Sequence, residues 1–348
     1  MRYSRISRRA FTSAVAFGAA ALAVPALRAQ ARLEKARLHM GLDGRAGFHC
    51  LPLTVAEQLG YFRAEGLDQE ITDVGGSGRK LQSLAGAGFD VISGPFEDTL
   101  ELQARGLPTQ AFVLQGRAPQ VAVGVSLRAL PGFREVVDLK GRRIGVSAPG
   151  SSTSLVANAV LARGGLHPAE VSFVGVGQAY GALAALRSGQ VEALSNTDPV
   201  MTMLEQRGEI RIISDTRTLK GTQEVFGGPM PAGCLYAPLE FVQKHPATCQ
   251  ALANAIVHAL KWLQTAGPRD IIRTVPEPYF QGDRALYLAA FSKVRESISP
   301  DGLMPDEGTR TAARALVAQD AALRADRLDL ARAFTNEFAR RAKERFHA

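Results

Sequence analysis

Segments typical of β-strands alternate with segments typical of α-helices over residues 37–215, and short glycine-rich loops join them. The strand-like run Arg37–Leu42, for example, precedes the helix-like run Leu53–Leu59, and the strand-like run Gln69–Val74 follows. Such a chain can form βαβ units, because two parallel strands need a long crossover that a helix supplies. The sequence therefore predicts sheets of mostly parallel strands with helices on their faces.

The alternation starts twice along the chain. Residues 37–115 hold one series and residues 120–215 hold a second, without a sequence repeat of fixed period. From Lys244 the chain is largely helical, and its amphipathic run Ala247–Thr265 carries the single tryptophan. A chain of 348 residues is long enough for two hydrophobic cores. We therefore expect two α/β domains followed by a helical tail.

Four hydroxyl residues in a row, Ser151 to Ser154, follow Pro149-Gly150 between the strand-like run Arg143–Val146 and a helix-like run. One hydroxyl is enough to cap a helix. A helix N-terminus also carries unpaired N–H groups and a partial positive charge, so this junction favours an anion-binding pocket at the carboxyl end of a strand. Plain helix capping is the alternative.

The N-terminal segment, residues 1–31, is typical of an export signal. Arg8-Arg9 is followed by the apolar run Ala14–Val24 and by Ala29-Gln30-Ala31, and the paired arginines indicate the twin-arginine route. The apolar run is much shorter than the ~20 residues that span a bilayer. We expect cleavage after Ala31 and a mature protein free in a bacterial periplasm.

Without the five arginines of residues 1–31, 36 of the 41 basic residues face 33 acidic ones, a net charge of +3. This excess is small and scattered, which argues against a nucleic-acid partner. Cys50, Cys234 and Cys249 have no CxxC spacing. One disulfide is possible in an oxidising compartment, but spacing alone does not pair them.

No motif in the sequence indicates catalysis. Gly175-x-Gly177 follows a strand-like run, but Tyr180 stands where a dinucleotide-binding fingerprint needs its third glycine, and Gly181 comes one residue late. These glycines are better explained by close helix–sheet packing. The six histidines are dispersed, without a metal-ligand spacing. We therefore expect no enzyme, no cofactor and no metal ion.

Three motifs in order resemble those of a known family. They are Gly60-Tyr61-Phe62 with Glu65-Gly66-Leu67, the run Asp138–Val146 followed by Pro149-Gly150-Ser151, and Ala184-Ala185-Leu186 followed by Gly189–Ala193. They are similar to the periplasmic solute-binding proteins of ABC importers for nitrate, taurine, sulfonates and thiamine-pyrimidine precursors. The resemblance covers about residues 36–340.

The resemblance implies the type II periplasmic-binding-protein fold, in which two α/β lobes, each a mostly parallel sheet flanked by helices, are joined by two hinge strands. Carried onto this chain, the hinge segments fall near Gln115–Val121 and Tyr236–Phe241. Lobe 1 would then comprise residues 32–117 and 241–348, and lobe 2 residues 118–240.

The family holds its ligand in the cleft between the lobes. Each loop assigned to this cleft follows a segment that the sequence pattern predicts to be a strand. The candidate ligand-binding residues are Arg45, Phe48, Gly76, Ser77, Gly78, Gly94, Pro95, Phe96, Glu97, Gly150, Ser151, Ser152, Thr153, Asn196, Asp198 and Gly228.

Individual residues leave the ligand open. Arg45 could grip a carboxylate or sulfonate, or be a solvated loop arginine; Glu97 or Asp98 could hold an amine or cap a helix. We favour a small organic anion, aromatic if Phe48 and Phe96 face it. The residues do not separate sulfonate from carboxylate, nitrate or pyrimidine.

The resemblance implies a monomeric binding component that delivers this anion to an ABC permease in the inner membrane. Two alternatives remain: a ligand-sensing module that docks a receptor, and an enzyme like the pyrimidine-precursor synthases, whose cysteine-rich motif is missing here.

Overall fold

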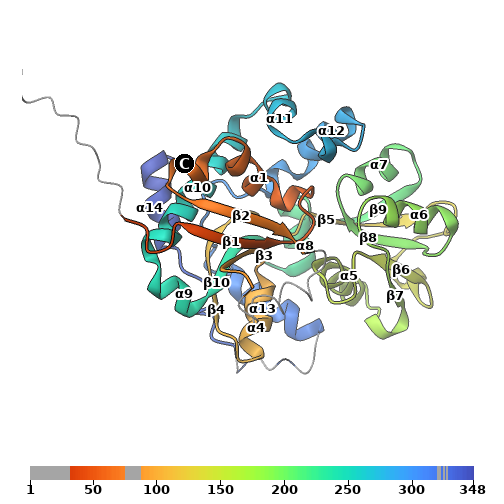
Figure 1. The fold of residues 1–348 in the computed structure, drawn as a ribbon. Coiled ribbons are helices and arrows are strands. Elements are labelled where there is room, and N and C mark those ends of the chain that lie inside the picture. Colours follow the sequence, from red (N-terminus) through yellow and green to blue (C-terminus); the bar gives the residue numbers. More distant parts are fainter. Residues whose placement is uncertain (1–31, 75–87, 320–322, 324–325, 327) are drawn as a thin grey trace, which may run out of the picture. The chain divides into compact units, whose positions relative to one another are not determined.

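The structure, a computed structural model, describes residues 32–74, 88–319, 323, 326 and 328–348. The export segment 1–31 and the candidate site residues Gly76, Ser77 and Gly78 lie outside these ranges, as does the run Arg79–Ala85, for which the sequence pattern predicts a helix. The described residues form two five-stranded sheets, each flanked by helices (Figure 1). The expectation of two α/β lobes is thereby confirmed.

The first sheet has the strand order β2 (Asp68–Asp73), β1 (Arg37–Leu42), β3 (Val91–Pro95), β10 (Gly233–Pro238) and β4 (Thr109–Leu114). The second has the order β7 (Ser172–Gly175), β6 (Arg143–Val146), β8 (Ala193–Thr197), β5 (Val121–Ser126) and β9 (Ile210–Asp215). In each sheet four strands share one direction, while β10 or β5 runs antiparallel to both of its neighbours. The sheets are mostly parallel, as the alternation predicts.

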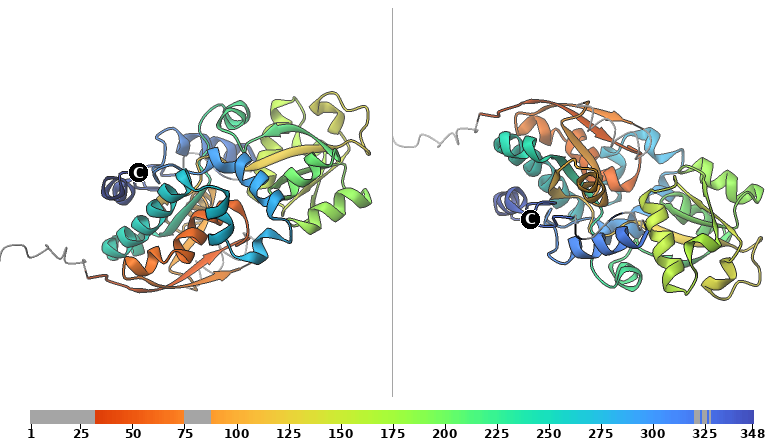
Figure 2. Two further views of the ribbon diagram at one scale, coloured as in Figure 1. Left: turned by 90° about the horizontal axis from the view of Figure 1, so that it is seen from above. Right: turned by 90° about the horizontal axis from the view of Figure 1, so that it is seen from below.

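The helices around the first sheet come from both ends of the chain, shown red to orange and teal to blue in Figures 1 and 2. They are α1 (Leu51–Gln58), α2 (Tyr61–Ala64), α4 (Glu97–Ala104), α9 (Leu239–Lys244), α10 (Pro246–Thr265), α11 (Pro268–Thr274), α12 (Arg284–Val294), α13 (Gly308–Gln319) and α14 (Glu337–Phe346). The second sheet is flanked by α5 (Ser152–Arg163), α6 (Tyr180–Ser188), α7 (Val200–Gln206) and α8 (Leu219–Phe226). Short 3-10 helices are η1 (Phe48–Cys50), η2 (Val136–Leu139), η3 (Pro168–Glu170), η4 (Glu277–Phe280) and η5 (Arg295–Ser297).

Strand β10 shows how the core of the first lobe is built. Its alternate residues face opposite sides of the sheet: Leu235 and Ala237 join one buried cluster, and Cys234 and Tyr236 join the other. A strand covered on both faces needs apolar residues at nearly every position, which β10 has. The helices α1, α10 and α14 cover the first face, and α4 and α13 cover the second.

The chain passes between the sheets through two segments, residues 115–120 and residues 227–232, here called the crossing segments. The first lies where the hinge is expected. The second does not: Tyr236 is inside β10, at the centre of the first sheet, so residues 233–240 belong to the first lobe. The crossing segments also pair with one another, since Ala232 N donates to Gly116 O at 2.9 Å.

Across the described ranges, no helix combines the length and apolar character needed to cross a bilayer. The longest helix named above, α10, packs against α14 and α1 instead. Cys50 and Cys249 are buried and outside any disulfide, and Cys234 is buried in β10.

Candidate functional site

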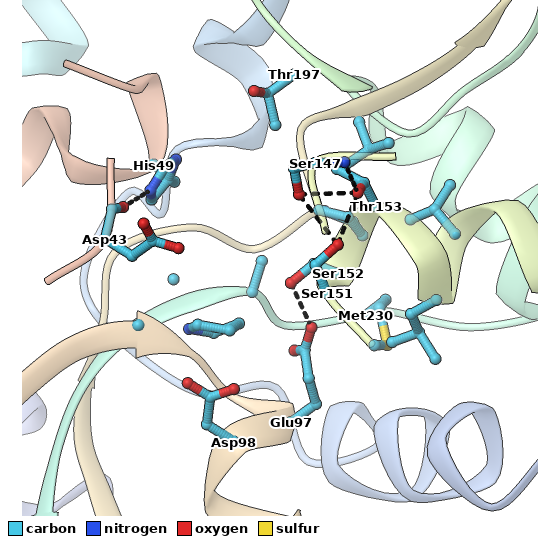
Figure 3. A pocket seen from close by; sticks show the side chains of 18 of the residues that line it. Asp43, His49, Glu97, Asp98, Ser147, Ser151, Ser152, Thr153, Thr197 and Met230 are labelled. Atoms are coloured by element: carbon cyan, nitrogen blue, oxygen red, sulfur yellow. Dashed lines mark hydrogen bonds between the residues drawn. The ribbon is translucent and has the colours of Figure 1, made fainter. Parts of the chain in front are cut away.

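A cavity of about 90 Å³ lies between the carboxyl ends of the parallel strands of the two sheets (Figure 3). We call it the cleft. The first lobe contributes the segment after β1, the end of β3 and the start of α4. The second contributes the segments after β6 and β7 and the last residue of β8, and both crossing segments form part of the wall. It is lined by Asp43, His49, Ser93, Gly94, Pro95, Glu97, Asp98, Pro119, Val121, Ser147, Gly150, Ser151, Ser152, Thr153, Leu155, Val156, Gln178, Thr197, Met230, Pro231, Ala232 and Gly233.

The N-terminus of α5 forms the second-lobe wall of the cleft. Gly150 has a φ of 78°, which favours glycine, and turns the chain into the helix. Ser147, Ser151 and Thr153 then bond to one another, with Ser151 Oγ 2.7 Å from Thr153 Oγ1 and Ser147 Oγ 3.0 Å from each. Ser151 is the N-cap residue, but its hydroxyl makes no bond to the first-turn N–H groups. The hydroxyls therefore hold the loop, and the helix end remains directed at the cleft.

Ser152 connects the two lobes. Its hydroxyl donates to Glu97 Oε1 at 2.6 Å, from the first residue of α5 to the first residue of α4 (Figure 3). A hydrogen bond to a carboxylate at this length is a strong, charge-assisted one. The lobes are thus in direct polar contact inside the cleft.

Three carboxylates line the first-lobe side. Asp43 follows β1, and Glu97 and Asp98 begin α4 with exposures of only 6% and 4%. Asp98 Oδ2 accepts from the Tyr236 hydroxyl at 2.8 Å, and burial, reinforced by this carboxylate, raises the pKa of Tyr236 well above its ordinary value. His49 is fixed by a 2.8 Å bond between Nε2 and Asp43 O. Among the described lining residues there is no lysine or arginine.

Seven of the predicted site residues line the cleft: Gly94, Pro95, Glu97, Gly150, Ser151, Ser152 and Thr153. They come from the β3–α4 junction of the first lobe and the β6–α5 junction of the second. The topology brings these junctions together because both strands end at the cleft.

Arg45, Phe48 and Phe96 lie elsewhere. The Arg45 guanidinium bonds to both carboxylate oxygens of Glu57 at 2.5 Å, so it holds the first loop to α1 and does not line the cleft. The Phe48 ring packs 4.6 Å from that of Tyr287 in the core, and Phe96 is fully buried. These side chains give the cleft neither the cation nor the aromatic wall that the sequence suggested.

Asn196, Asp198 and Gly228 also lie outside the cleft lining. Asn196 is buried and donates to Gly177 O at 3.0 Å, while its neighbour Thr197 lines the cleft. Asp198 pairs with the buried Arg217 at 3.2 Å; burial raises the pKa of this carboxyl, although Arg217 opposes the shift. Gly228 lines a different cavity.

Several lining residues escaped sequence reasoning. Asp43 is the first residue after β1, in a loop that was assigned to the cleft, so its position was the available signal. Ser147 likewise directly follows β6. The segment Met230–Gly233 gave no such signal, because it leads into β10, a strand whose place in the first sheet depends on pairing with distant residues.

Gly181, after β7, is required by packing. A Cβ on Gly181 would lie 2.2 Å from Val176 O, so only glycine lets α6 start this close to the strand exit. Gln178, three residues before it, lines the cleft. No group of three or more histidine, cysteine, aspartate or glutamate side chains in the described ranges is arranged to hold a metal ion.

Solved structures share this fold. A protein from Bordetella bronchiseptica RB50 is 54% identical, with a TM-score of 0.86, covering 91% of this chain and 100% of its own. The alkanesulfonate-binding protein SsuA from Xanthomonas axonopodis pv. citri, bound to MOPS, is 21% identical (TM-score 0.66; 87% and 99% covered). The periplasmic nitrate-binding protein NrtA from Synechocystis PCC 6803 is 15% identical (TM-score 0.68; 90% and 89% covered).

A family model described as NMT1/THI5 like matches residues 48–268, which include the cleft loops after β3, β6, β7 and β8 and both crossing segments. The two mixed five-stranded sheets agree with the fold of the periplasmic binding proteins above. The chain therefore belongs to the NMT1/THI5-like family and has the two-lobed α/β fold of periplasmic binding proteins.

Proposed function

We propose that this chain is the solute-binding component of an ABC import system and captures a small organic acid that also carries a protonated amine. The observation that carries the proposal is the composition of the cleft, with carboxylates on one wall and a helix N-terminus on the other. The fold supports the binding role, and the cleft chemistry supports the ligand class.

The first-lobe wall favours a cation. Asp43, Glu97 and Asp98 place three carboxylates on this wall. A ligand ammonium group would form charge-assisted hydrogen bonds with them, whereas an anion without an amine would meet like charge on this side.

The second-lobe wall favours an anion. The first turn of α5 has no side-chain cap from Ser151, and Gly150, Ser151, Ser152 and Thr153 line the cleft. A sulfonate or carboxylate at this position would accept from the N–H groups and interact favourably with the helix dipole. A compact amino-sulfonate or amino acid spans both walls.

A calorimetric titration of residues 32–348 with taurine, ethanesulfonate and ethylamine tests this reasoning. We expect taurine to bind tightest, since only taurine offers both charges. Because a hydrogen bond to a charged group contributes about 1.5–3 kcal/mol, loss of the amine should weaken binding by about tenfold or more. The variant Glu97→Gln should erase most of the difference between taurine and ethanesulfonate.

Glu344→Gln is the matched control, because Glu344 is an exposed glutamate on α14 outside the cleft lining. It should preserve the preference for taurine. Equal binding of ethanesulfonate and taurine to the unmodified chain would contradict the proposed ligand class. Absence of any effect of Glu97→Gln on taurine binding would contradict the proposed cleft.

Export and delivery complete the proposal. The Arg8-Arg9 motif supports secretion by the twin-arginine route into the periplasm, and the binding-protein fold supports delivery to a permease of the inner membrane. Both lobes contribute to the cleft, so the permease would receive ligand when the lobes separate.

A further inference from the structure

A second cavity, of about 580 Å³, is formed where the crossing segments meet the tail of the first lobe. Leu219 on α8 belongs to its second-lobe wall, and Leu303 and Met304 belong to its first-lobe wall. Leu303 and Met304 follow Gly302, whose carbonyl accepts from Leu114 N of β4 at 2.8 Å, so this wall is fixed to the first sheet. The volume of this cavity and its apolar walls are typical of a small-molecule binding site.

The second cavity and the cleft share both crossing segments. In the first segment Arg117 lines the second cavity, while Pro119 lines the cleft. In the other segment Gly228 and Pro229 line the second cavity, while Met230 lines the cleft. Residues one or two positions apart in each crossing segment thus line different cavities. The two segments therefore separate the second cavity from the cleft.

The polar groups of the second cavity leave it with positive charge. Arg117 donates from Nε to Glu296 O at 3.0 Å, and the exposed Arg340 side chain has no bonded partner within the described residues. Asp301 is neutralised by Lys343 at 2.7 Å. Asp306 is exposed, and its carboxylate is the one that opposes an anion here.

We propose that the second cavity is a binding site for a small molecule with an apolar body and one carboxylate. The body lies against Leu219, Leu303 and Met304, and the carboxylate accepts from the guanidinium of Arg340, a geometry in which arginine binds carboxylates with two parallel donors. This ligand differs from that of the cleft in having no amine and a larger apolar part.

Occupation of this cavity is coupled to the relative position of the lobes. Besides the bond between Ser152 and Glu97, two further polar contacts join the lobes in this conformation. Lys293 of α12 pairs with Glu205 of α7 at 2.5 Å, and Leu219 N donates to Glu296 Oε1 at 2.7 Å. Since walls from both lobes define the cavity in this joined state, its ligand favours the joined state over a separated one.

Methionine methyl NMR on residues 32–348 tests the site, with octanoate as the probe. Met304 lines the second cavity and Met230 lines the cleft, so their ¹³C-methyl signals distinguish the two. We expect octanoate to shift the Met304 signal in a saturable way and to leave that of Met230 in place. A shift of Met230 alone, or no shift of Met304 at millimolar octanoate, would overturn the proposal.

Three comparisons isolate the chemistry. Arg340→Gln, on the surface of α14, should weaken octanoate binding about fivefold or more, because it removes the charged donor. Asp306→Asn should strengthen octanoate binding, because it removes a negative charge. The neutral probe 1-octanol should bind equally to the unmodified chain and to Arg340→Gln. Equal octanoate affinity in Arg340→Gln would refute the carboxylate site.

Solution scattering tests the coupling between the second cavity and the lobes. Saturating octanoate should leave the radius of gyration equal or smaller, and a larger radius would refute the coupling. These outcomes are independent of what the cleft binds.

Discussion

The hydrogen bond between Ser152 and Glu97 makes the cleft unusually sensitive to one substitution, Ser152→Asp. The serine hydroxyl lies 2.6 Å from Glu97 Oε1 and donates to it. An aspartate at the same position loses the donor and places a second carboxylate against Glu97. Because Ser152 is the first residue of α5, the new carboxylate is favourable for the helix itself. The substitution should therefore disfavour contact between the lobes without unfolding either lobe.

The size of the effect follows from the geometry. Two unit charges about 4 Å apart repel by about 4 kcal/mol at an effective dielectric constant of about 20. The lost charge-assisted hydrogen bond adds about 1.5–3 kcal/mol. Ser152 is only partly buried, so solvent screens part of the repulsion. We take about 1.4 kcal/mol, a tenfold shift away from the joined state, as the smallest expected effect.

Solution scattering and calorimetry measure this shift together. The radius of gyration of the free Ser152→Asp protein should exceed that of the parent, and taurine affinity should fall by about tenfold or more. Chemical denaturation should give a free energy of unfolding within about 1 kcal/mol of the parent, because the helix tolerates aspartate there. Ser152→Ala is the control and should lose only the hydrogen bond.

A second substitution separates repulsion from a simple loss of contact. Glu97→Gln in the Ser152→Asp background replaces the repelling carboxylate with an amide that can donate to aspartate. The radius should then return toward that of the parent, a coupling that a double-mutant cycle measures. If Ser152→Asp left both radius and taurine affinity unchanged, Ser152 and Glu97 would not be in contact in solution and the reasoning would fail.

Three further predictions concern other parts of the chain. Arg217→Met leaves Asp198 buried without its cation and should lower the free energy of unfolding by about 3–5 kcal/mol in urea denaturation, a larger loss than an exposed ion pair would cause. Burial raises the pKa of the Cys249 thiol to about 12, so iodoacetamide at pH 8 should label it only when the chain is unfolded, as peptide mass spectrometry would show; fast labelling of native protein would contradict this. Lysines in place of Arg8 and Arg9 should leave precursor in the cytoplasm on cell fractionation, whereas normal periplasmic amounts would exclude the twin-arginine route.

Local hydrophobic patterns predicted the positions of several elements well. The strand-like run Arg143–Val146 matches β6, and the amphipathic run Ala247–Thr265 matches α10 within one residue. The sequence pattern predicts that the helix after the hydroxyl run starts at Ser154, but α5 begins at Ser152 because Ser151 takes the extended N-cap conformation.

Local sequence patterns did not predict which distant strands pair or in which direction side chains point. Strand β10 inserts between β3 and β4, a placement set by hydrogen bonds to residues more than a hundred positions away, and the second crossing segment was therefore expected too late in the chain. Arg45 follows a strand as a cleft residue should, but Glu57 on the next helix binds it instead. A strand end indicates where a loop lies, not which way its side chains point.

The hydroxyl run also explains how a cleft whose described lining holds no lysine or arginine could still select an anion. The hydroxyls of Ser151 and Thr153 in this run bond to each other and to that of Ser147, so they shape the loop without blocking the end of α5. The helix dipole then supplies the positive field, and the carboxylates of the other lobe oppose any ligand that brings negative charge alone. Specificity is a difference in affinity, and a cleft with opposite fields on its two walls creates that difference by penalising ligands that lack either charge. The same arrangement makes lobe contact depend on ligand, because Glu97 must exchange its bond with Ser152 for one with the incoming amine or accept both.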